Sequence, residues 1–305
     1  MQNPEPVTSN PEAPKPTSAI ALLPPPLLLD QLLQAWLLED MGRGDRTTQS
    51  LFSAEIPSGQ AQWVVKEAGI IAGLPIAARV FYLLNPAARF EALAQEGEWC
   101  DRGRVVAQIA GPLDALLTGE RVALNLAMRL SGIATLTSKY VAQIADLPAQ
   151  LVDTRKTTPG LRILEKYAVQ VGGAVNHRLG LDDGVMIKDN HIAAAGSIAK
   201  AIALVRARIP YPLTVEVETE TLAQVAEALD HGADIIMLDN MSVERMRDAV
   251  RMIRDTNPRI KIEASGNITL DTIRAIAETG VDYLSSSAPI TRSTWLDLSM
   301  RIQMG

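Results

Sequence analysis

Six short apolar runs between residues 150 and 290 dominate the sequence, and each ends in charged or hydroxyl-bearing residues. The runs are LVDTRK (151–156), VMIKDN (185–190), TVEVETE (214–220), IIMLDN (235–240), IKIEASGN (260–267) and VDYLSSS (281–287). A helix-length amphipathic stretch follows each run, and this alternation is typical of βα units around a parallel sheet. A complete (β/α)₈ barrel needs eight such units. We therefore expect a six-stranded, partly open α/β barrel of the TIM-like type.

The segment before these runs indicates a second, smaller domain. From Pro26 onward, leucines recur at helical spacing up to a pair of glycines, which predicts a helix with a glycine stop. The stretches 61–71 and 104–109 lie between glycines and suit a small antiparallel sheet. Two separate helices, 113–129 and 133–144, would then lead into the barrel.

These patterns divide the chain into four parts. We expect a disordered, proline-rich tail over residues 1–25, an N-terminal α+β sandwich domain over 26–130, the catalytic barrel over 131–289, and a C-terminal helix over 290–305. Prolines among polar residues keep such a tail extended and solvated. The C-terminal helix is expected to return to the N-terminal domain.

Composition narrows the class of protein. With 47% hydrophobic and 21% charged residues over 305 positions, the chain can bury the core of one large or two ordinary domains. A net charge of −6 argues against nucleic acid as a partner, because binding to a phosphate backbone needs a basic face. The longest apolar stretch, 19–29, is broken by prolines and is too short to span a membrane. A single cysteine, Cys100, and the lack of a secretory signal pattern indicate a cytoplasmic protein.

Acids at the ends of two neighbouring runs predict a metal site. Side chains alternate along a strand, so Glu216 and Glu218 share one face and would point into the barrel mouth. Asp239 ends the next run and would lie beside Glu218. Because Mg²⁺ prefers one or two carboxylates together with water and substrate oxygens, Glu218 and Asp239 are its candidate ligands. The alternative is a structural network in which these acids only neutralise Lys156 and Lys188.

Cations gather in the first two barrel units and indicate an anionic substrate. Residues 153–160 (DTRKTTPG) place Thr154, Arg155 and Lys156 in one strand-to-helix turn. Arginine offers a bidentate fork for carboxylate or phosphate, whereas lysine offers a point charge. The next unit adds His177, Arg178 and Lys188. Taken alone, residues 153–160 could form a solvated turn, and the recurrence of cations argues against that alternative.

Small residues at the ends of the last two runs suit a phosphate group. Ser265, Gly266 and Asn267 follow one run, and Ser286 and Ser287 follow the other. Such turns in barrels hold phosphate through backbone N–H groups and the helix that follows. Ser265 could equally cap that helix, and the two roles are compatible.

Arg121 lies on the helix that ends the N-terminal domain, one turn before Asn125 on the same face. An arginine there could serve the barrel mouth. The residues alone favour a plainer interpretation, a surface ion pair with Glu120 or Asp114.

The chain resembles quinolinate phosphoribosyltransferase, the carboxylating nicotinate-nucleotide pyrophosphorylase of NAD biosynthesis, from about residue 30 to residue 300. The matching blocks are GERVALNLAMRLSGIAT (119–135), DTRKTTPGLR (153–162), GGAVNHRLGLDDGVMIKDNHI (172–192), VEVET (215–219), DIIMLDN (234–240) and ASGNIT (264–269). The resemblance implies that quinolinate and phosphoribosyl pyrophosphate give nicotinate mononucleotide, pyrophosphate and CO₂ in the presence of Mg²⁺.

The resemblance also implies a role for each matched residue. Arg121 would cross to the partner subunit of a homodimer and contact a quinolinate carboxylate there. Glu218 and Asp239 would hold the ribose hydroxyls and Mg²⁺ and act in catalysis with Arg155 and Lys156, which would orient the departing carboxylate. The quinolinate and pyrophosphate sites would be lined by Thr154, Arg155, Lys156, His177, Arg178 and Lys188, and the 5′-phosphate would be held by Ser265, Gly266, Asn267, Ser286 and Ser287.

Two positions depart from the family pattern. Many relatives have a glycine where Asn267 stands and another near Ser287. If the backbone there needs a positive φ, asparagine can adopt it with modest strain, whereas serine is less suited.

Two other functions stay open at the level of the sequence. A transferase of the same architecture that acts on nicotinate or on a molybdenum-system ligand would need fewer carboxylate-binding arginines than Arg121, Arg155 and Arg178. A non-catalytic phosphosugar-binding or regulatory barrel would keep the serine-rich turns but would not need Glu218 and Asp239.

Overall fold

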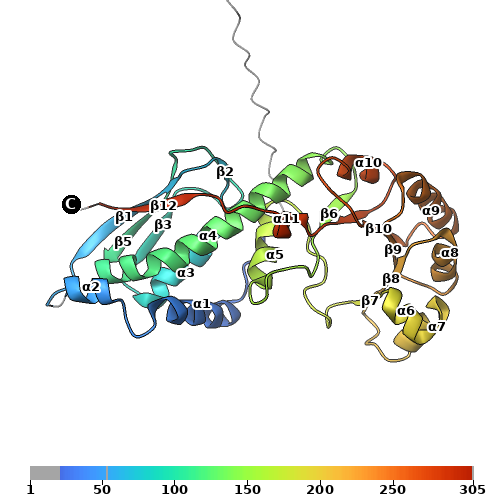
Figure 1. Ribbon diagram of the computed structural model, residues 1–305, viewed down its shortest axis with the longest axis horizontal. Coiled ribbons are helices and arrows are strands. Elements are labelled where there is room, and N and C mark those ends of the chain that lie inside the picture. Colours follow the sequence, from blue (N-terminus) through green and yellow to red (C-terminus); the bar gives the residue numbers. More distant parts are fainter. Residues whose placement is uncertain (1–20, 53, 304–305) are drawn as a thin grey trace, which may run out of the picture.

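The computed structural model describes residues 21–52 and 54–303, and Figure 1 shows two domains joined by one long helix. The disordered tail expected over residues 1–25 falls almost entirely outside the described residues. None of the helices in the described part of the chain has the length and apolarity that crossing a membrane requires.

The N-terminal domain is an antiparallel sheet with helices packed on it, as expected. Its four main strands run in the order β12 (Leu298–Gln303), β1 (Ser58–Val65), β5 (Val105–Pro112) and β3 (Arg89–Ala92), and β2 (Gly69–Ile70) pairs with β4 (Trp99–Cys100). Its helices are α1 (Pro26–Met41), α2 (Arg46–Leu51) and α3 (Leu74–Leu84). Trp63 of β1 is fully buried and meets Phe81 and Phe90 edge-on, with ring centroids 6.4 and 5.6 Å away. These three rings form the centre of the domain's core.

The C-terminal segment forms a strand, and the prediction of a helix over residues 290–305 is wrong. β12 pairs antiparallel with β1, from Leu298 opposite Val65 to Gln303 opposite Gln60. Without β12, β1 would be an edge strand with unpaired N–H and C=O groups, and an extended segment satisfies them. The helix that overlaps the start of this segment is α11 (Ala288–Thr291), which has four residues and ends before β12 begins. The segment does reach the N-terminal domain.

One continuous helix, α4 (Leu113–Ala142), replaces the two separate helices expected over 113–129 and 133–144. Gly132 lies inside it and does not end it. A side chain at this position would clash, because an added Cβ would lie 1.8 Å from the carbonyl oxygen of Thr294. The glycine therefore lets the segment before β12 cross the helix at close range, and α4 spans both domains (Figure 1).

The second domain is the expected six-stranded, partly open barrel. Its parallel strands run in the order β6 (Gln150–Val152), β11 (Tyr283–Ser285), β10 (Lys261–Ser265), β9 (Ile235–Asp239), β8 (Val215–Thr219) and β7 (Val185–Ile187). The helices between them are α5 (Arg162–Val171), α6 (Asp189–Ala195), α7 (Ile198–Arg206), α8 (Leu222–Asp230), α9 (Val243–Thr256) and α10 (Ile273–Ala277). In the described chain, the end strands β6 and β7 do not pair with each other, which leaves the barrel open on that side.

Alternation along the strands gives the barrel two chemically different faces. Val217, Leu238 and Ile262 are fully buried, and each lies next in sequence to a polar residue or a methionine. Successive side chains of a strand point to opposite faces, so the aliphatic set packs under the helices. The acids of β8, β9 and β10 accordingly share the inner face, which is where the candidate site lies.

Candidate active site

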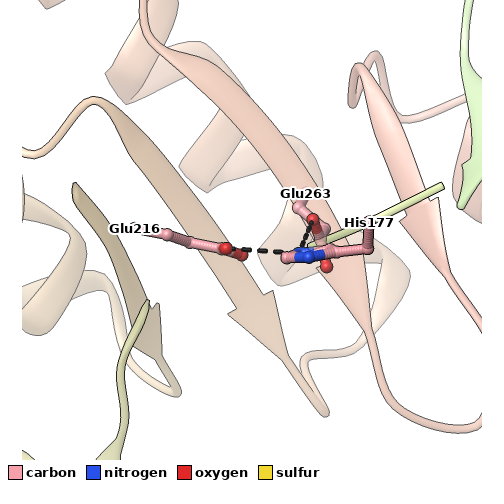
Figure 2. A group of neighbouring side chains, drawn as sticks. All are labelled: His177, Glu216 and Glu263. Atoms are coloured by element: carbon pink, nitrogen blue, oxygen red, sulfur yellow. Dashed lines mark ion pairs between the residues drawn. The ribbon is translucent and has the colours of Figure 1, made fainter. Parts of the chain in front are cut away.

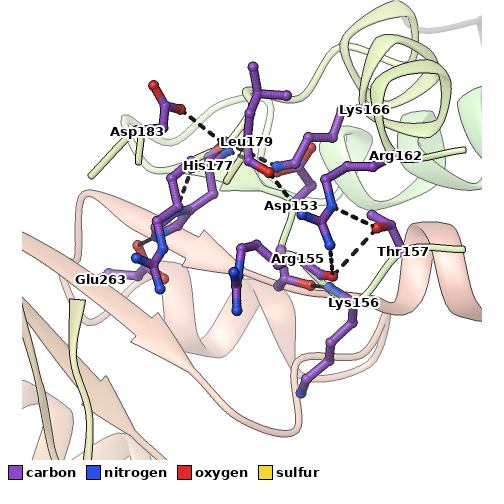
Figure 3. A network of polar contacts seen from close by, with 12 residues as sticks. Asp153, Arg155, Lys156, Thr157, Arg162, Lys166, His177, Leu179, Asp183 and Glu263 are labelled. Carbon is purple, nitrogen blue, oxygen red and sulfur yellow. Dashed lines mark hydrogen bonds and ion pairs between the residues drawn. The ribbon is translucent and has the colours of Figure 1, made fainter. Parts of the chain in front are cut away.

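The cation turn, residues 153–160 after β6, is held in place by hydrogen bonds from Arg162, while its two cationic side chains form no ion pair with the residues that the structure describes. Arg162 donates from Nε to Thr157 Oγ1 (3.0 Å) and from Nη2 to the carbonyl of Arg155 (3.3 Å), as Figure 3 shows. The side chains of Arg155 and Lys156 are exposed, and neither forms an ion pair with any described residue. Thr154 is engaged locally, because its hydroxyl oxygen accepts the N–H of Lys156 (3.0 Å). The turn thus presents two free cations from a fixed backbone.

A buried acid ties this turn to both domains. Glu165 of α5 has no exposed side-chain area and accepts from the N–H (2.8 Å) and the hydroxyl (2.9 Å) of Thr158. It also accepts from Arg129 of α4 at 2.7 Å. Because its carboxylate accepts hydrogen bonds from both Thr158 and Arg129, Glu165 holds the turn against α4, the helix that joins the two domains.

The loop that carries His177 and Arg178 is anchored by a buried ion pair, Asp153 with Lys166, whose side chains have no exposed area. Asp153 accepts the N–H of His177 (2.8 Å), and Lys166 donates to the carbonyl of His177 (3.0 Å). Burial raises the pKa of Asp153 and lowers that of Lys166, and the opposite charge of the partner counters each shift. Hydrogen bonds therefore hold the backbone of His177 at both its N–H and its carbonyl group.

The ring of His177 meets two buried glutamates inside the barrel (Figure 2). Its Nε2 lies 3.2 Å from Oε2 of Glu216 on β8 and 3.3 Å from Oε2 of Glu263 on β10. Burial alone would lower the pKa of His177, but hydrogen bonds to the two carboxylates and their charge outweigh it and raise the pKa to about 10. The buried cluster of His177, Glu216 and Glu263, here called the trio, therefore keeps a proton well above neutral pH.

This retained proton makes stability fall on the alkaline side. Because the folded pKa of His177, about 10, exceeds the unfolded value near 6.5, the trio's contribution is fully present below about pH 6.5 and is lost as pH rises towards 10. We expect the free energy of unfolding to drop by up to about 1.4 kcal/mol per pH unit in this window. Urea unfolding at a series of pH values measures the slope.

The matched control for the slope is the double variant Glu216→Gln/Glu263→Gln, which removes both charges and keeps the shape. Burial also raises the pKa of the Cys100 thiol, to about 11. Above roughly pH 8.5 the thiol ionises more readily in the unfolded chain, so this shift too lowers the free energy of unfolding as pH rises. Cys100 is common to both proteins, so the difference between the two curves isolates the trio. Identical slopes would contradict the prediction.

The two expected metal ligands lie on neighbouring strands and face the same side. Met237 is the register partner of Glu218, and Asp239 lies two residues further along β9, which makes Glu218 and Asp239 diagonal neighbours. Lys188 pairs with Glu218 at 2.9 Å, as the structural alternative requires, whereas Lys156 has no acid partner among the described residues. Asn240 donates to the other acid, Asp239, at 2.6 Å. Two carboxylates in this arrangement offer the oxygen donors that Mg²⁺ prefers.

The two serine-rich turns lie side by side, because β10 and β11 are neighbours and Ser265 is in register with Ser285. Asn267 has a φ of 53°, so asparagine does supply the left-handed conformation there. Ser287 has a φ of −85°, which any residue adopts, so the departure from glycine carries no backbone strain. The hydroxyl of the buried Ser286 donates to the carbonyl of Ile268 (3.2 Å) and links the two turns.

Gly266 is fixed by both conformation and space. Its φ is 90°, and an added Cβ would lie 2.1 Å from the side-chain oxygen of Asn240. We expect Gly266→Ala to lower the free energy of unfolding by about 1–3 kcal/mol. Gly160→Ala is the matched control, because Gly160 has a φ of 83° but nothing within 4 Å of its added Cβ. Equal losses in the two variants, measured by urea unfolding, would show that the contact with Asn240 costs nothing.

Arg121 is separate from these groups within one chain. Its side chain is 58% exposed, and the nearest acid is Glu120 at 3.7 Å, the plainer pairing that the sequence favoured. Two residues earlier, Gly119 packs against Phe81 and Leu84 of α3, which places this turn of α4 on the N-terminal domain.

Family models cover most of the chain. The model for the C-terminal domain of quinolinate phosphoribosyl transferase matches residues 133–301, and the model for its N-terminal domain matches residues 45–131. The chain belongs to the quinolinate phosphoribosyltransferase family.

Relatives in this family resemble the chain over nearly its whole length. A probable nicotinate-nucleotide pyrophosphorylase (carboxylating) from Synechocystis sp. is 62% identical over 92% of the chain and 94% of its own length. One from Bacillus subtilis is 46% identical, over 91% and 94%. Among solved structures, NadC from Streptococcus pyogenes superposes with a TM-score of 0.87 at 43% identity and covers 92% of this chain and 99% of its own.

The structure brings into the candidate site several residues that the sequence alone did not indicate. Glu263 joins Glu216 on His177, although the two strands that carry them are separated by β9. From α5, Lys166 supports the loop that carries His177 and Arg162 supports the cation turn, and Arg162 belongs to the block DTRKTTPGLR (153–162). One signal was available, because a lysine within the apolar face of an amphipathic helix implies a buried acid partner.

Proposed function

We propose that the protein is a decarboxylating quinolinate phosphoribosyltransferase, which forms nicotinate mononucleotide, pyrophosphate and CO₂ from quinolinate and phosphoribosyl pyrophosphate in de novo NAD biosynthesis. One observation carries the proposal. Arg155 and Lys156, which form no ion pair within the described residues, follow a strand of the same sheet edge as the acids Glu218 and Asp239. The printed names of the Synechocystis and Bacillus relatives support the same reaction.

Both substrates are anions, so the site must first overcome their mutual repulsion. The free cations of the turn and the nearby Arg178 and Lys188 supply that attraction. Transfer of the ribose develops positive charge at its anomeric carbon, and pyrophosphate is already a good leaving group. Positioning and electrostatics can therefore supply the catalysis without a protein nucleophile. Arg155 and Lys156 would then orient the 2-carboxylate. As CO₂ departs, the electron pair of the C2–carboxylate bond stays on C2 of the quaternised pyridine ring, and a proton from solvent takes the place of the carboxylate.

The acids and the serine-rich turns would take the sugar phosphate. Glu218 and Asp239 would hold the ribose hydroxyls and a Mg²⁺ ion, which when bound neutralises charge on the departing pyrophosphate. The 5′-phosphate would lie against the turns of Ser265 and Ser286, where backbone N–H groups are available. Asn267 supports this use because its φ of 53° lets the turn curl without a glycine.

The test is a paired assay of the purified protein with phosphoribosyl pyrophosphate and Mg²⁺, following pyridine-nucleotide absorbance and CO₂ release. One reaction contains quinolinate and the other contains nicotinate. Product and gas from quinolinate alone are expected. Product from nicotinate alone would assign the sister reaction, and binding without turnover in either mixture would identify a phosphosugar-binding barrel.

We further propose a homodimer in which Arg121 enters the partner subunit's site. Its exposure and its lack of a barrel partner within the described chain support this role. Mixing Arg121→Ala with Lys156→Ala protomers should then restore about a quarter of wild-type activity, because half of the dimers are mixed and one of their two sites is intact. The activity of refolded equimolar mixtures, compared with each variant alone, measures this. No recovery in mixtures shown to contain mixed dimers would place Arg121 outside the shared site.

We also propose a cytoplasmic location for the protein. Burial raises the pKa of Cys100, its only cysteine, to about 11, so the thiol stays protonated and inert. A fold that needs no disulfide suits a reducing compartment.

A further inference from the structure

Arg129 lies on α4 near the middle of the molecule, where Figure 1 shows α5 and α11 packed beside the same stretch of helix. Its side chain is only 15% exposed, although it carries a full charge. A charge that is largely removed from water needs polar partners in the protein. The partners of Arg129 come from two segments that are far apart in the sequence, and each segment belongs to a different part of the candidate site.

All five N–H donors of the Arg129 guanidinium are used by protein acceptors. Nε and Nη2 donate to Oε1 of Glu165 on α5, at 3.1 and 2.7 Å. Nη2 also donates to the carbonyl of Ile290 in α11, at 2.9 Å. Nη1 donates to the hydroxyl of Ser293 at 2.8 Å and to its carbonyl at 3.4 Å. A guanidinium has five donors and no acceptor, so Arg129 has no donor left for a substrate.

The contact with Glu165 connects Arg129 to the cation turn. Glu165 has no exposed side-chain area, and its two oxygens accept the N–H and the hydroxyl of Thr158. Thr158 stands two residues after Lys156 in the same turn. A shift of the Glu165 carboxylate would therefore move the backbone that presents Lys156 to the barrel mouth.

The contact with Ile290 connects Arg129 to the serine-rich turn after β11. The helix α11 begins directly after Ser287, whose carbonyl accepts the N–H of Ile290 at 3.0 Å. The hydroxyl of Ser286 accepts the N–H of Ala288 at 3.3 Å. A single helical turn that is bonded in this way moves together with the residues ahead of it. Arg129 therefore holds the far end of the segment that begins with Ser286.

The distance between these two turns matters for the transfer step of the proposed function. The cation turn would hold the 2-carboxylate of quinolinate, and the serine-rich turn would hold the 5′-phosphate of the sugar. The pyridine nitrogen attacks the anomeric carbon while the bond from that carbon to pyrophosphate breaks. Such atoms react when they lie about 3–3.5 Å apart and in line, and a misplacement of about 1 Å can cost about 10²-fold in rate.

We propose that Arg129 is a positioning residue that sets the spacing between the cation turn and the serine-rich turn, and so aligns the two substrates without touching either. The inference rests on the proposed function for its kinetic test. Its structural part, one guanidinium that joins both turns to α4, does not depend on the reaction.

The first test is hydrogen exchange, followed by mass spectrometry, on Arg129→Lys, which keeps the charge and loses the planar fork. We expect the amides of two segments, 157–162 and 287–294, to exchange about tenfold faster than in wild type, the loss of about one hydrogen bond at each. Faster exchange in one segment alone, or in neither, would overturn the proposal.

The matched control is Arg254→Lys. Like Arg129, Arg254 donates to one backbone carbonyl, that of Ile260, and to one carboxylate, that of Asp282, each at 2.8 Å. These two residues directly precede β10 and β11, at the end of the strands opposite the candidate site. The control should therefore leave the exchange of both segments and the turnover unchanged.

The second test separates alignment of the substrates from stability of the fold. We expect Arg129→Lys to lower kcat about 10- to 100-fold, with KM for each substrate within about threefold of wild type, because each turn keeps its own groups and only their spacing changes. A kcat per folded site equal to that of wild type would show that Arg129 serves the fold alone. A rise in KM for one substrate alone would show that it acts on a single turn, and either result would overturn the proposal.

Ser293→Ala replaces Arg129→Lys if the lysine variant does not fold. It removes the hydroxyl that accepts from Nη1 and leaves the contact with Glu165, so kcat should fall about threefold to tenfold with both KM values unchanged. An unchanged kcat would again overturn the proposal. A wild-type protein that does not turn over quinolinate would defeat the proposed function, while the exchange comparison would still decide whether Arg129 joins the two turns.

Discussion

Lys156→Ala is expected to lower turnover of quinolinate by about 10²- to 10³-fold, because one of the charges that meets the departing carboxylate is lost. The side chain is exposed and forms no ion pair with the described residues, so the fold should be unaffected. Steady-state kinetics measure the loss, and urea unfolding should give a midpoint equal to that of wild type.

The matched control is Lys200→Ala, which removes an exposed lysine from α7, outside the turn. It should retain full turnover. Near-normal turnover in Lys156→Ala would remove this lysine from the mechanism and leave Arg155 as the only orienting group of the turn.

Lys166→Met should cost about 3–5 kcal/mol of folding free energy, because it leaves Asp153 as a buried charge without its partner. The side chains of both residues are fully buried, and each also holds the backbone of His177. Guanidinium unfolding followed by circular dichroism measures the change.

The double variant Asp153→Asn/Lys166→Met tests the cause of that loss. With no charge left to strand, it should be more stable than Lys166→Met alone. A double variant that is as unstable as the sum of the two single variants would mean that packing, not the stranded charge, sets the cost.

The barrel could be predicted because each of its strands carries its own signal. A β-branched apolar run that ends in polar residues marks a buried strand and its carboxyl end together, as VEVET does over 215–219. The N-terminal sheet was harder, because its last strand comes from the far end of the chain. Leu296, Leu298, Met300 and Ile302 alternate with the period of a strand, but the run is short and a helix fits it almost as well.

The continuity of α4 also depends on a remote contact. Gly132 looks like a break when only its neighbours in sequence are considered. Its reason is the close approach of Thr294, more than 160 residues later, which no local pattern encodes.

The placement of the candidate residues at the strand ends could be predicted from the sequence, whereas the contact inside the barrel could not. Arg155, Lys156, Glu218 and Asp239 stand where the runs end, so their common edge follows from the parallel sheet alone. The meeting of Glu216 with Glu263 requires the curvature of the sheet, because β9 separates their strands. Curvature is a property of the closed packing and leaves no mark in either strand's sequence.

The position of β12 in the first sheet bears on how the chain folds as it is made. β1 emerges early from the ribosome, while its neighbour β12 is synthesised only after the whole barrel. The N-terminal sheet must therefore wait, with one edge unpaired, for the 185 residues between β5 and β12, and an unpaired edge invites wrong partners. The two domains form one cooperative unit in this sense, and a fragment that ends with the barrel would leave the first domain unfinished.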